Sequence, residues 1–275
     1  MIFRKRVELF LRTVIGRAYP RLIGLQRERS WLIFDTLLPL LQMSAFVFVY
    51  RAMQAPPEYT GFVVLGGAMT AYWLNVLWSM ATQLHWEKEN GNLALFIMAP
   101  TSRMAILLGM ALGGIVATSF RAAAVVLVGI FIFGAHFSAE RIPELIGIFL
   151  LTLIALYGMG MLFSSLFLLY GREAWHMSLL LQEPIYLLSG FYFPVRSLGY
   201  WTAMGASIVP ITLGLDAMRQ LLFPRMMQQI KFLDVRIELL VLAVLGLVFL
   251  FLAQRSLSYM ERLACQEGRL TVRGQ

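Results

Sequence analysis

HWEKENGNLALFIMAPTSRMAILLG, residues 85–109, lies between two long apolar runs and decides how the rest of the chain is organised. Charged residues at positions 87–89 and at Arg103 flank an apolar cluster at 93–98. A chain that only had to cross and recross a membrane would need no more than a short turn here. The pattern predicts a short amphipathic helix at the membrane surface that offers its apolar face to something outside the bilayer. A solvated loop that happens to contain leucines is the alternative.

The composition of the chain is that of an integral membrane protein. Of its 275 residues, 59% are hydrophobic and 14% are charged, and the mean hydropathy is +0.73. A bilayer core of about 30 Å needs roughly 20 apolar residues in a helix. Runs of that order occupy 32–50, 61–84, 104–137, 145–170, 175–193 and 237–254. The sequence therefore predicts an all-α integral membrane protein in which a single domain, residues 1–275, crosses the bilayer six times.

The third apolar run, 104–137, is too long for a straight span, because its 34 residues would extend about 51 Å as a helix. It must tilt, break or begin in the interface, and Gly113-Gly114 is the expected place for a break. Two glycine pairs, Gly109 with Gly113 and Gly158 with Gly160, are expected to allow close packing between helices of this chain.

Residues 1–30 are too polar to form a span. Apolar residues recur every three or four positions from Phe3 to Leu22, and most of the basic residues fall elsewhere around the helical wheel. This predicts an amphipathic helix in the membrane interface, bent or ended by Pro20. A basic unstructured arm is the alternative. Residues 255–275 are expected to form a cytoplasmic tail.

The basic residues predict the orientation. With six spans, the side that holds both termini carries 15 of the 23 Lys and Arg residues, the other side carries 7, and Arg121 lies within a run. The positive-inside rule then places both termini in the cytoplasm. The net charge of +8 follows from topology and lipid contact, so nucleic acid is not implied. No cleavable signal peptide is visible, and the single Cys265 is expected to be a plain intracellular thiol.

The segment after the fifth run, residues 189–223, is too polar for a simple span and too apolar for a free loop. Pro194 and Pro210 divide it into short pieces with helical spacing. We expect a re-entrant helical hairpin over 194–223, which dips into the outer leaflet and satisfies its backbone against protein. An ordinary extracytoplasmic surface loop is the alternative.

Three ionisable residues, Asp35, Arg121 and Glu183, fall inside the apolar runs, where a charge is costly unless it is compensated. Asp35 is placed to reach the cytoplasmic headgroups, and Arg121 to reach the outer interface. Glu183 and Pro184 predict a kink that lines a polar cavity on the pathway. The alternatives for Glu183 are a structural pair with Arg121 or misplaced span boundaries.

The sequence contains no pattern typical of catalysis or metal binding. His85, His136 and His176 are far apart, and none has a His, Cys or acidic pair at ligand spacing. The chain has no G-x-x-x-x-G-K-[ST] phosphate loop, so it cannot itself be an ATPase, and it has no G-x-S-x-G nucleophile motif. We therefore expect no catalytic residue, no metal and no cofactor bound by this chain.

Two motif regions give the chain its resemblance to a known family. The first comprises Glu87, Gly91, Leu93, residues 99–103 and residues 107–109, and the second comprises residues 188–194, 210–212 and 216–219. Their order and spacing resemble the permease subunit of type 2 ABC exporters, the family of daunorubicin-resistance-type drug exporters and O-antigen or teichoic-acid exporters. The resemblance covers nearly the whole chain, from the N-terminal interfacial helix to the tail around Gly268.

The resemblance implies a half-transporter. Two permeases, identical or paralogous, would pair in the prokaryotic cytoplasmic (inner) membrane, and two separate ABC ATPase subunits holding ATP and Mg²⁺ would dock from the cytoplasm. Residues 86–103 would be the coupling segment, through Glu87, Glu89, Gly91, Leu93, Leu95, Phe96, Pro100 and Arg103. The translocation pathway would involve Phe46, Tyr50, Glu183, Pro184 and Tyr186. The exit region would involve Ser189, Gly190, Pro194, Pro210 and Arg219.

The function expected from this resemblance is ATP-driven export of an amphiphilic small molecule or lipid-like substrate. A lipid-linked glycan is the alternative substrate, because aromatic residues at the seam between the first and fifth spans could stack with either. A membrane-embedded lipid-modifying enzyme is the rival from another class, and it would need clustered His, Asp or Ser residues that the sequence lacks. A passive scaffold or channel is a third reading.

Overall fold

The computed structural model describes residues 2–27, 29–99, 101–138, 140–170 and 174–267. Within these ranges the chain forms helices and no strands. The long helices are α1 (Ile2–Arg27), α2 (Arg29–Ala52), α3 (Glu58–Leu74), α6 (Arg103–Phe131), α7 (Ile142–Tyr170), α8 (Ala174–Leu188) and α12 (Val235–Glu267). The short ones are α4 (Gln83–Glu89), α5 (Leu93–Met98), α9 (Tyr200–Ala206), α10 (Pro210–Leu222) and α11 (Pro224–Ile230).

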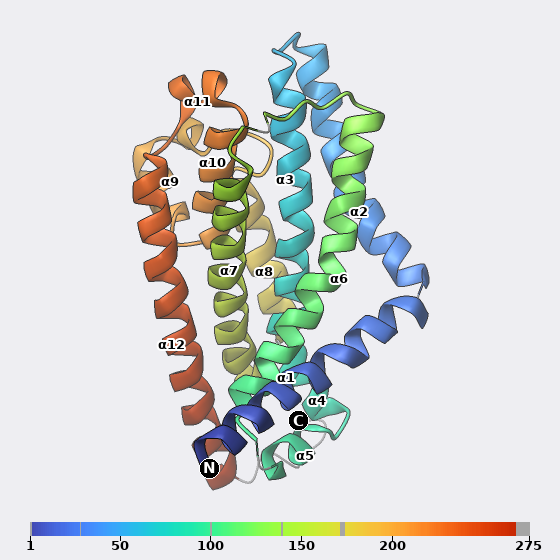
Figure 1. Cartoon of the computed structure of the whole chain (residues 1–275), viewed down its shortest axis with the longest axis vertical. Helices are drawn as coiled ribbons and strands as arrows, with labels where there is room; N and C mark the ends of the chain where they lie inside the picture. Colours follow the sequence, from blue (N-terminus) through green and yellow to red (C-terminus); the bar gives the residue numbers. More distant parts are fainter. Residues whose placement is uncertain (1, 28, 100, 139, 171–173, 268–275) are drawn as a thin grey trace.

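Apart from α1, the long helices run roughly along the longest axis of the molecule, and the short ones lie toward its two ends (Figure 1). Helices α4 and α5 lie at one end, where α1 crosses the bundle obliquely. Helices α9 and α11 lie at the opposite end. The start of α1 and the end of α12 lie at the same end as α4 and α5, which is the arrangement that an even number of crossings requires.

Five segments of the described residues are long and apolar enough to cross a membrane. They are Ile33–Ala52, Glu58–Glu89, Arg103–Phe131, Ile142–Phe167 and Val235–Tyr259. The expected fifth run, 175–193, corresponds to α8, whose 15 residues extend only about 22 Å. The all-α membrane architecture is therefore confirmed, whereas the sixth crossing stays a prediction.

Helix α6 does not break at Gly113-Gly114, so that prediction was wrong. It is continuous from Arg103 to Phe131, and the chain leaves the helix only afterwards, at 132–138. The glycines serve close packing instead. A Cβ at Gly109 would lie 2.5 Å from the Val14 carbonyl oxygen, and one at Gly113 would lie 3.0 Å from that of Ala18. Helix α1 therefore crosses α6 backbone to backbone, as the expected close packing at this glycine pair requires.

Helix α1 also continues through Pro20, where the sequence suggested a bend or an end. It runs to Arg27, so the prediction that Pro20 ends the helix was wrong. A proline inside a helix removes one backbone hydrogen bond and crowds the carbonyl four residues earlier. That carbonyl belongs to Gly16, whose surroundings are open, and packing of α1 across α6 helps to hold the helix together despite this cost.

The core of the bundle is built around α3 and α10. Most of α3 is buried, including the large side chains of Phe62 and Trp73. Helix α10 buries twelve of its 13 residues, although it lies in the segment that the sequence marked as irregular. The short helical pieces expected in 194–223 are present: a turn at Gly190, with φ of +66°, precedes them, and a turn at Gly199, with φ of +89°, separates the first two. Their depth in a membrane stays a prediction.

Candidate functional site

The segment between the second and third apolar runs forms two short helices, α4 and α5, joined by a tight turn. Gly91 adopts φ +76°, a conformation that other residues rarely adopt, and its amide donates to the Lys88 carbonyl at 3.0 Å. The amide of Asn92 donates to the Glu87 carbonyl at 2.9 Å, so the turn is closed by two hydrogen bonds. Pro100, which the sequence assigned to this site, lies outside the described residues.

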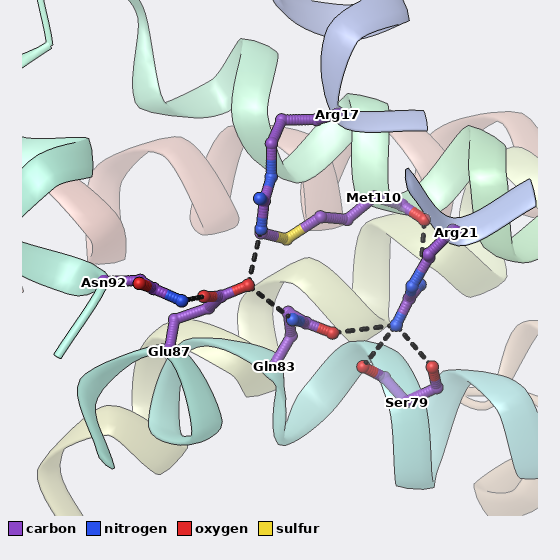
Figure 2. Close-up of polar contacts among 7 residues, drawn as sticks. All are labelled: Arg17, Arg21, Ser79, Gln83, Glu87, Asn92 and Met110. Carbon is purple, nitrogen blue, oxygen red and sulfur yellow. Dashed lines mark hydrogen bonds and ion pairs between the residues drawn. The ribbon is translucent and has the colours of Figure 1, made fainter. Parts of the chain in front are cut away.

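Glu87 forms the central polar contacts of this site. Its side chain is buried and accepts hydrogen bonds from Arg17 Nη2 at 2.5 Å, Gln83 Nε2 at 2.9 Å and Asn92 Nδ2 at 3.0 Å (Figure 2). Through these contacts one carboxylate joins α1, α4 and the turn that begins α5. The sequence placed Glu87 at the coupling site, but it gave no sign of the partner on α1.

Arg21, one turn after Arg17, extends the network to Ser79 and to α6. Its Nη1 donates to the Met110 carbonyl at 2.9 Å, and its Nη2 donates to the Ser79 carbonyl at 3.0 Å, to Ser79 Oγ and to Gln83 Oε1 at 2.8 Å (Figure 2). Burial lowers the pKa of the Arg21 guanidinium, since desolvation disfavours its charged form. These hydrogen bonds offset that desolvation and fix α1 to α4 and α6.

One part of the apolar face of α5 is exposed, and another part packs against α1. Leu95 is 60% exposed and Met98 is 73% exposed. Phe96 is half-buried, and the Arg17 guanidinium carbon lies 4.4 Å from the centre of its ring. Of these two members of the predicted coupling segment, Leu95 is therefore available to a partner, whereas Phe96 holds α5 against α1. Glu89 is exposed and Arg103 half-buried at the edges of the segment.

A π-helix, Asn75–Ala81, joins α3 directly to α4. Side chains of three other helices form hydrogen bonds with it. Tyr157 of α7 donates to Asn75 Oδ1 at 2.8 Å, Trp78 Nε1 donates to Gln182 of α8 at 2.6 Å, and Arg21 of α1 donates to the Ser79 carbonyl. Single-turn π segments inside helices often mark functional sites. This one lies between the coupling segment and the helix expected on the pathway. The sequence analysis missed it, because hydropathy carries no signal for a π turn.

Aromatic side chains from α2 and α8 meet at the turn that follows α8. Phe46 stacks on Tyr192 with 4.4 Å between ring centres, and the Tyr50 hydroxyl donates to the Tyr192 carbonyl at 2.9 Å. Tyr186 packs edge-on against Phe191 at 5.6 Å. Three of the expected pathway residues, Phe46, Tyr50 and Tyr186, are thus brought to one region, where they surround the turn that contains the buried Phe191.

Glu183 does not pair with Arg121, so that alternative was wrong. Arg121 instead forms an ion pair with Asp35 of α2 at 2.8 Å. Each of these two side chains was expected to reach a membrane surface separately, and the structure pairs them with each other. Glu183 is exposed on α8 and accepts a hydrogen bond from Gln182 at 3.2 Å. Helix α8 continues through Pro184, which is exposed as well.

Arg219 holds the exit region together. Its guanidinium is buried, donates to the carbonyls of Gly190 and Phe191 at 2.6 Å each and to that of Phe62 at 3.1 Å, and lies over the Phe62 ring. Ser189 is buried beside this turn. Pro194 precedes a short 3₁₀-helix, Val195–Leu198, and Pro210 is the first residue of α10. Arg219 therefore satisfies a turn that would otherwise bury bare carbonyls.

Across the residues that the structure describes, no three His, Cys, Asp or Glu side chains come together as a metal site would require. The polar clusters of this molecule instead join one helix to another. The arrangement can transmit movement between helices, and the exposed face of α5 is the part of it that a partner could reach.

Comparison with known families identifies the chain. The family model described as ABC-2 type transporter matches residues 21–223, which is most of the sequence. The chain therefore belongs to the ABC-2 type transporter family, as the two motif regions suggested. It is the transmembrane component of an ABC transporter, a multi-pass membrane protein that works with an ABC ATPase subunit. No curated protein matches the chain.

Proposed function

We propose that two permeases, either two copies of this chain or this chain and a paralogue, combine with two ABC ATPase subunits into an exporter of the prokaryotic inner membrane. The complex moves an amphiphilic small molecule or lipid-like substrate outward and uses ATP and Mg²⁺ bound by the ATPase subunits. Both termini are cytoplasmic. The end of the bundle that holds α4 and α5 then faces the ATPase subunits.

The hydrogen bonds of Glu87 carry this proposal. They fix the turn before α5 to α1 and α4, so a displacement of α5 is passed to the rest of the bundle as a movement of rigid elements. The π-helix leads from α4 to Trp78, whose bond to Gln182 reaches α8. ATP-driven closure of the ATPase subunits would thereby move α8, and substrate would pass between α2 and α8 of the two permeases.

The surface of α2 supports the placement of the pathway. Along this helix large apolar side chains remain exposed, among them Phe34, Leu41 and Phe48. In a membrane protein an exposed apolar face is covered by lipid or by another helix, so α2 is available to the second permease. Phe46 and Tyr50 on α2 and Tyr186 on α8 would offer aromatic faces to an amphiphile that passes along this seam.

The decisive variant is Leu95→Asp, because Leu95 is 60% exposed and a carboxylate there should disturb the fold little. Phe96→Asp is less informative, since Phe96 packs beneath Arg17 and its loss would disturb the site itself. Met53→Asp is the matched control, because Met53 is an exposed apolar residue directly after α2, and α2 ends far from α4 and α5 (Figure 1). We expect Leu95→Asp to abolish co-purification with the ABC ATPase subunit while Met53→Asp retains it. Equal co-purification of both variants would exclude α5 as the docking surface.

A further inference from the structure

A cavity of about 560 Å³ lies among α9, α11 and the loop before α12. Helices α9 and α11 are at the end of the molecule opposite to α4 and α5 (Figure 1). The cavity is lined by Arg196, Tyr200 and Gln228 and by the loop 231–234 that leads into α12. Neither the ATPase nor the seam between α2 and α8 accounts for it. Its volume is in the range of small-ligand sites, about 300–1,000 Å³.

The fold determines the shape of this cavity. Asp216 and Gln220 of α10 hold the loop from below, since the Phe232 amide donates to Asp216 Oδ2 at 3.1 Å and Gln220 Nε2 donates to the Leu233 carbonyl at 2.8 Å. Arg196 holds it from the side through hydrogen bonds from Nη1 to the carbonyls of Gln229 and Lys231, at 3.3 and 3.4 Å. The lining is therefore fixed before any ligand arrives.

Arg196 supplies the net positive charge of the cavity. Lys231 Nζ and Asp234 Oδ1 form an ion pair at 2.9 Å, so these two residues largely cancel each other. Both hydrogen bonds of Arg196 leave from Nη1, which leaves the Nη2 edge without a hydrogen bond among the described residues. Arg196 is itself exposed. A guanidinium edge of this kind matches the oxygen atoms of a phosphate group.

Next to the cavity, α9 presents an apolar and aromatic surface. Tyr200 is 56% exposed and Trp201 is 82% exposed, and Met204 and Ile208 extend the exposed surface. Tyr200 also lies against Phe232 of the cavity wall, with 6.0 Å between ring centres. Exposed Trp and Tyr at the end of a transmembrane bundle are typical of the level of the lipid headgroups. A ligand with its head at Arg196 would lay its apolar part along α9.

We propose that this cavity binds the phosphate headgroup of an anionic phospholipid, with Arg196 holding the phosphate and α9 supporting an acyl chain. The site is independent of the proposed export function, because neither the ATPase nor the exported substrate enters the argument. It would anchor the short helices at this end to the surrounding lipid.

The test is competitive lipid binding to the purified chain, read by native mass spectrometry. Phosphatidylglycerol and phosphatidylcholine with identical acyl chains are added in equal amounts. Both headgroups contain a phosphate, but the choline cation offsets its charge in phosphatidylcholine. We therefore expect the wild type to retain phosphatidylglycerol in preference, and Arg196→Gln to lower that preference about tenfold. Arg196→Lys should keep part of it. Arg225→Gln, which removes an exposed cation from α11 outside the cavity, is the matched control and should leave it unchanged.

Two outcomes would overturn the proposal. The first is an equal loss of preference in Arg196→Gln and Arg225→Gln, which would mean that only the general positive charge of this end matters. The second is complete displacement of the lipid by water-soluble glycerol phosphate at the same concentration, which would mean that the cavity takes a free anion and α9 plays no part. Lys231→Gln provides a second variant of the lining; it leaves the Asp234 carboxylate without its counter-charge and should therefore weaken phosphatidylglycerol retention as well.

Discussion

Replacing Glu87 with Gln should loosen α1 from the rest of the molecule. Glu87 accepts hydrogen bonds from three donors, whereas a glutamine has one acceptor oxygen and an amide group that would face at least one of those donors. The Arg17 guanidinium would then lose its counter-charge. Arg17→Gln should give the same effect from the other side of the pair.

The structure sets the size of the effect. The Arg17 and Glu87 side chains are 26% and 9% exposed. An exposed pair contributes about 0.2–1 kcal/mol, whereas removal of one partner from a fully buried pair costs about 3–5 kcal/mol. Because Arg17 retains some water and its contact with Phe96, we place the cost at about 2 kcal/mol. This corresponds to a roughly 30-fold increase in the population with α1 detached.

Hydrogen–deuterium exchange of the purified chain measures this opening. We expect the amides of α1 to exchange roughly 30-fold faster in either single variant, and the double variant to show less than the sum of the two losses, because the residues form one pair. Arg12→Gln is the control, since Arg12 pairs with Glu8 on the exposed face of the same helix. Exchange in Glu87→Gln equal to that in Arg12→Gln would refute the role of the pair in holding α1.

Two further predictions concern packing and charge inside the bundle. Gly66→Ala should lower the melting temperature by at least about 6 °C, because the new Cβ would lie 1.6 Å from the Phe191 carbonyl oxygen. Gly147→Ala is the control. Gly147 has open surroundings in α7, so this change should leave the melting temperature unchanged or raise it slightly. Arg121→Gln should destabilise the protein by about 1–3 kcal/mol, and adding Asp35→Asn should restore part of the loss, because the two residues form an ion pair. Glu183→Gln should have no such effect. Thermal melts in which Asp35→Asn does not rescue Arg121→Gln would contradict the pair.

The sequence predicted the helices well because bilayer-length apolar runs and turn-forming residues are local signals. The short helices of 194–223 follow in this way from Pro194 and Pro210. The coupling segment is an exception, since one short amphipathic helix was expected there and the left-handed turn at Gly91 divides it into α4 and α5. The neighbouring sequence could not predict that Leu95 is exposed and Phe96 is packed, because this difference depends on where α1 lies.

Contacts between distant segments were the part that the sequence could not supply. Asp35 and Arg121 both lie in apolar runs, but nothing in their spacing shows that α2 and α6 bring them together. The Gly113-Gly114 break was expected from run length alone, whereas the observed helix is stabilised by the close approach of α1. A signal for the coupling network did exist, since Arg17 and Arg21 lie four residues apart on one face of α1.

The central claim is that ATP hydrolysis by a partner, transmitted through α5, drives outward transport through this chain. Inside-out membrane vesicles containing the complex test it most directly, with a fluorescent amphiphile and ATP supplied outside. The account predicts ATP-dependent accumulation of the amphiphile in vesicles with the wild-type chain or Met53→Asp, and none with Leu95→Asp. Accumulation that needs no ATP, or that is unchanged in Leu95→Asp, would contradict it.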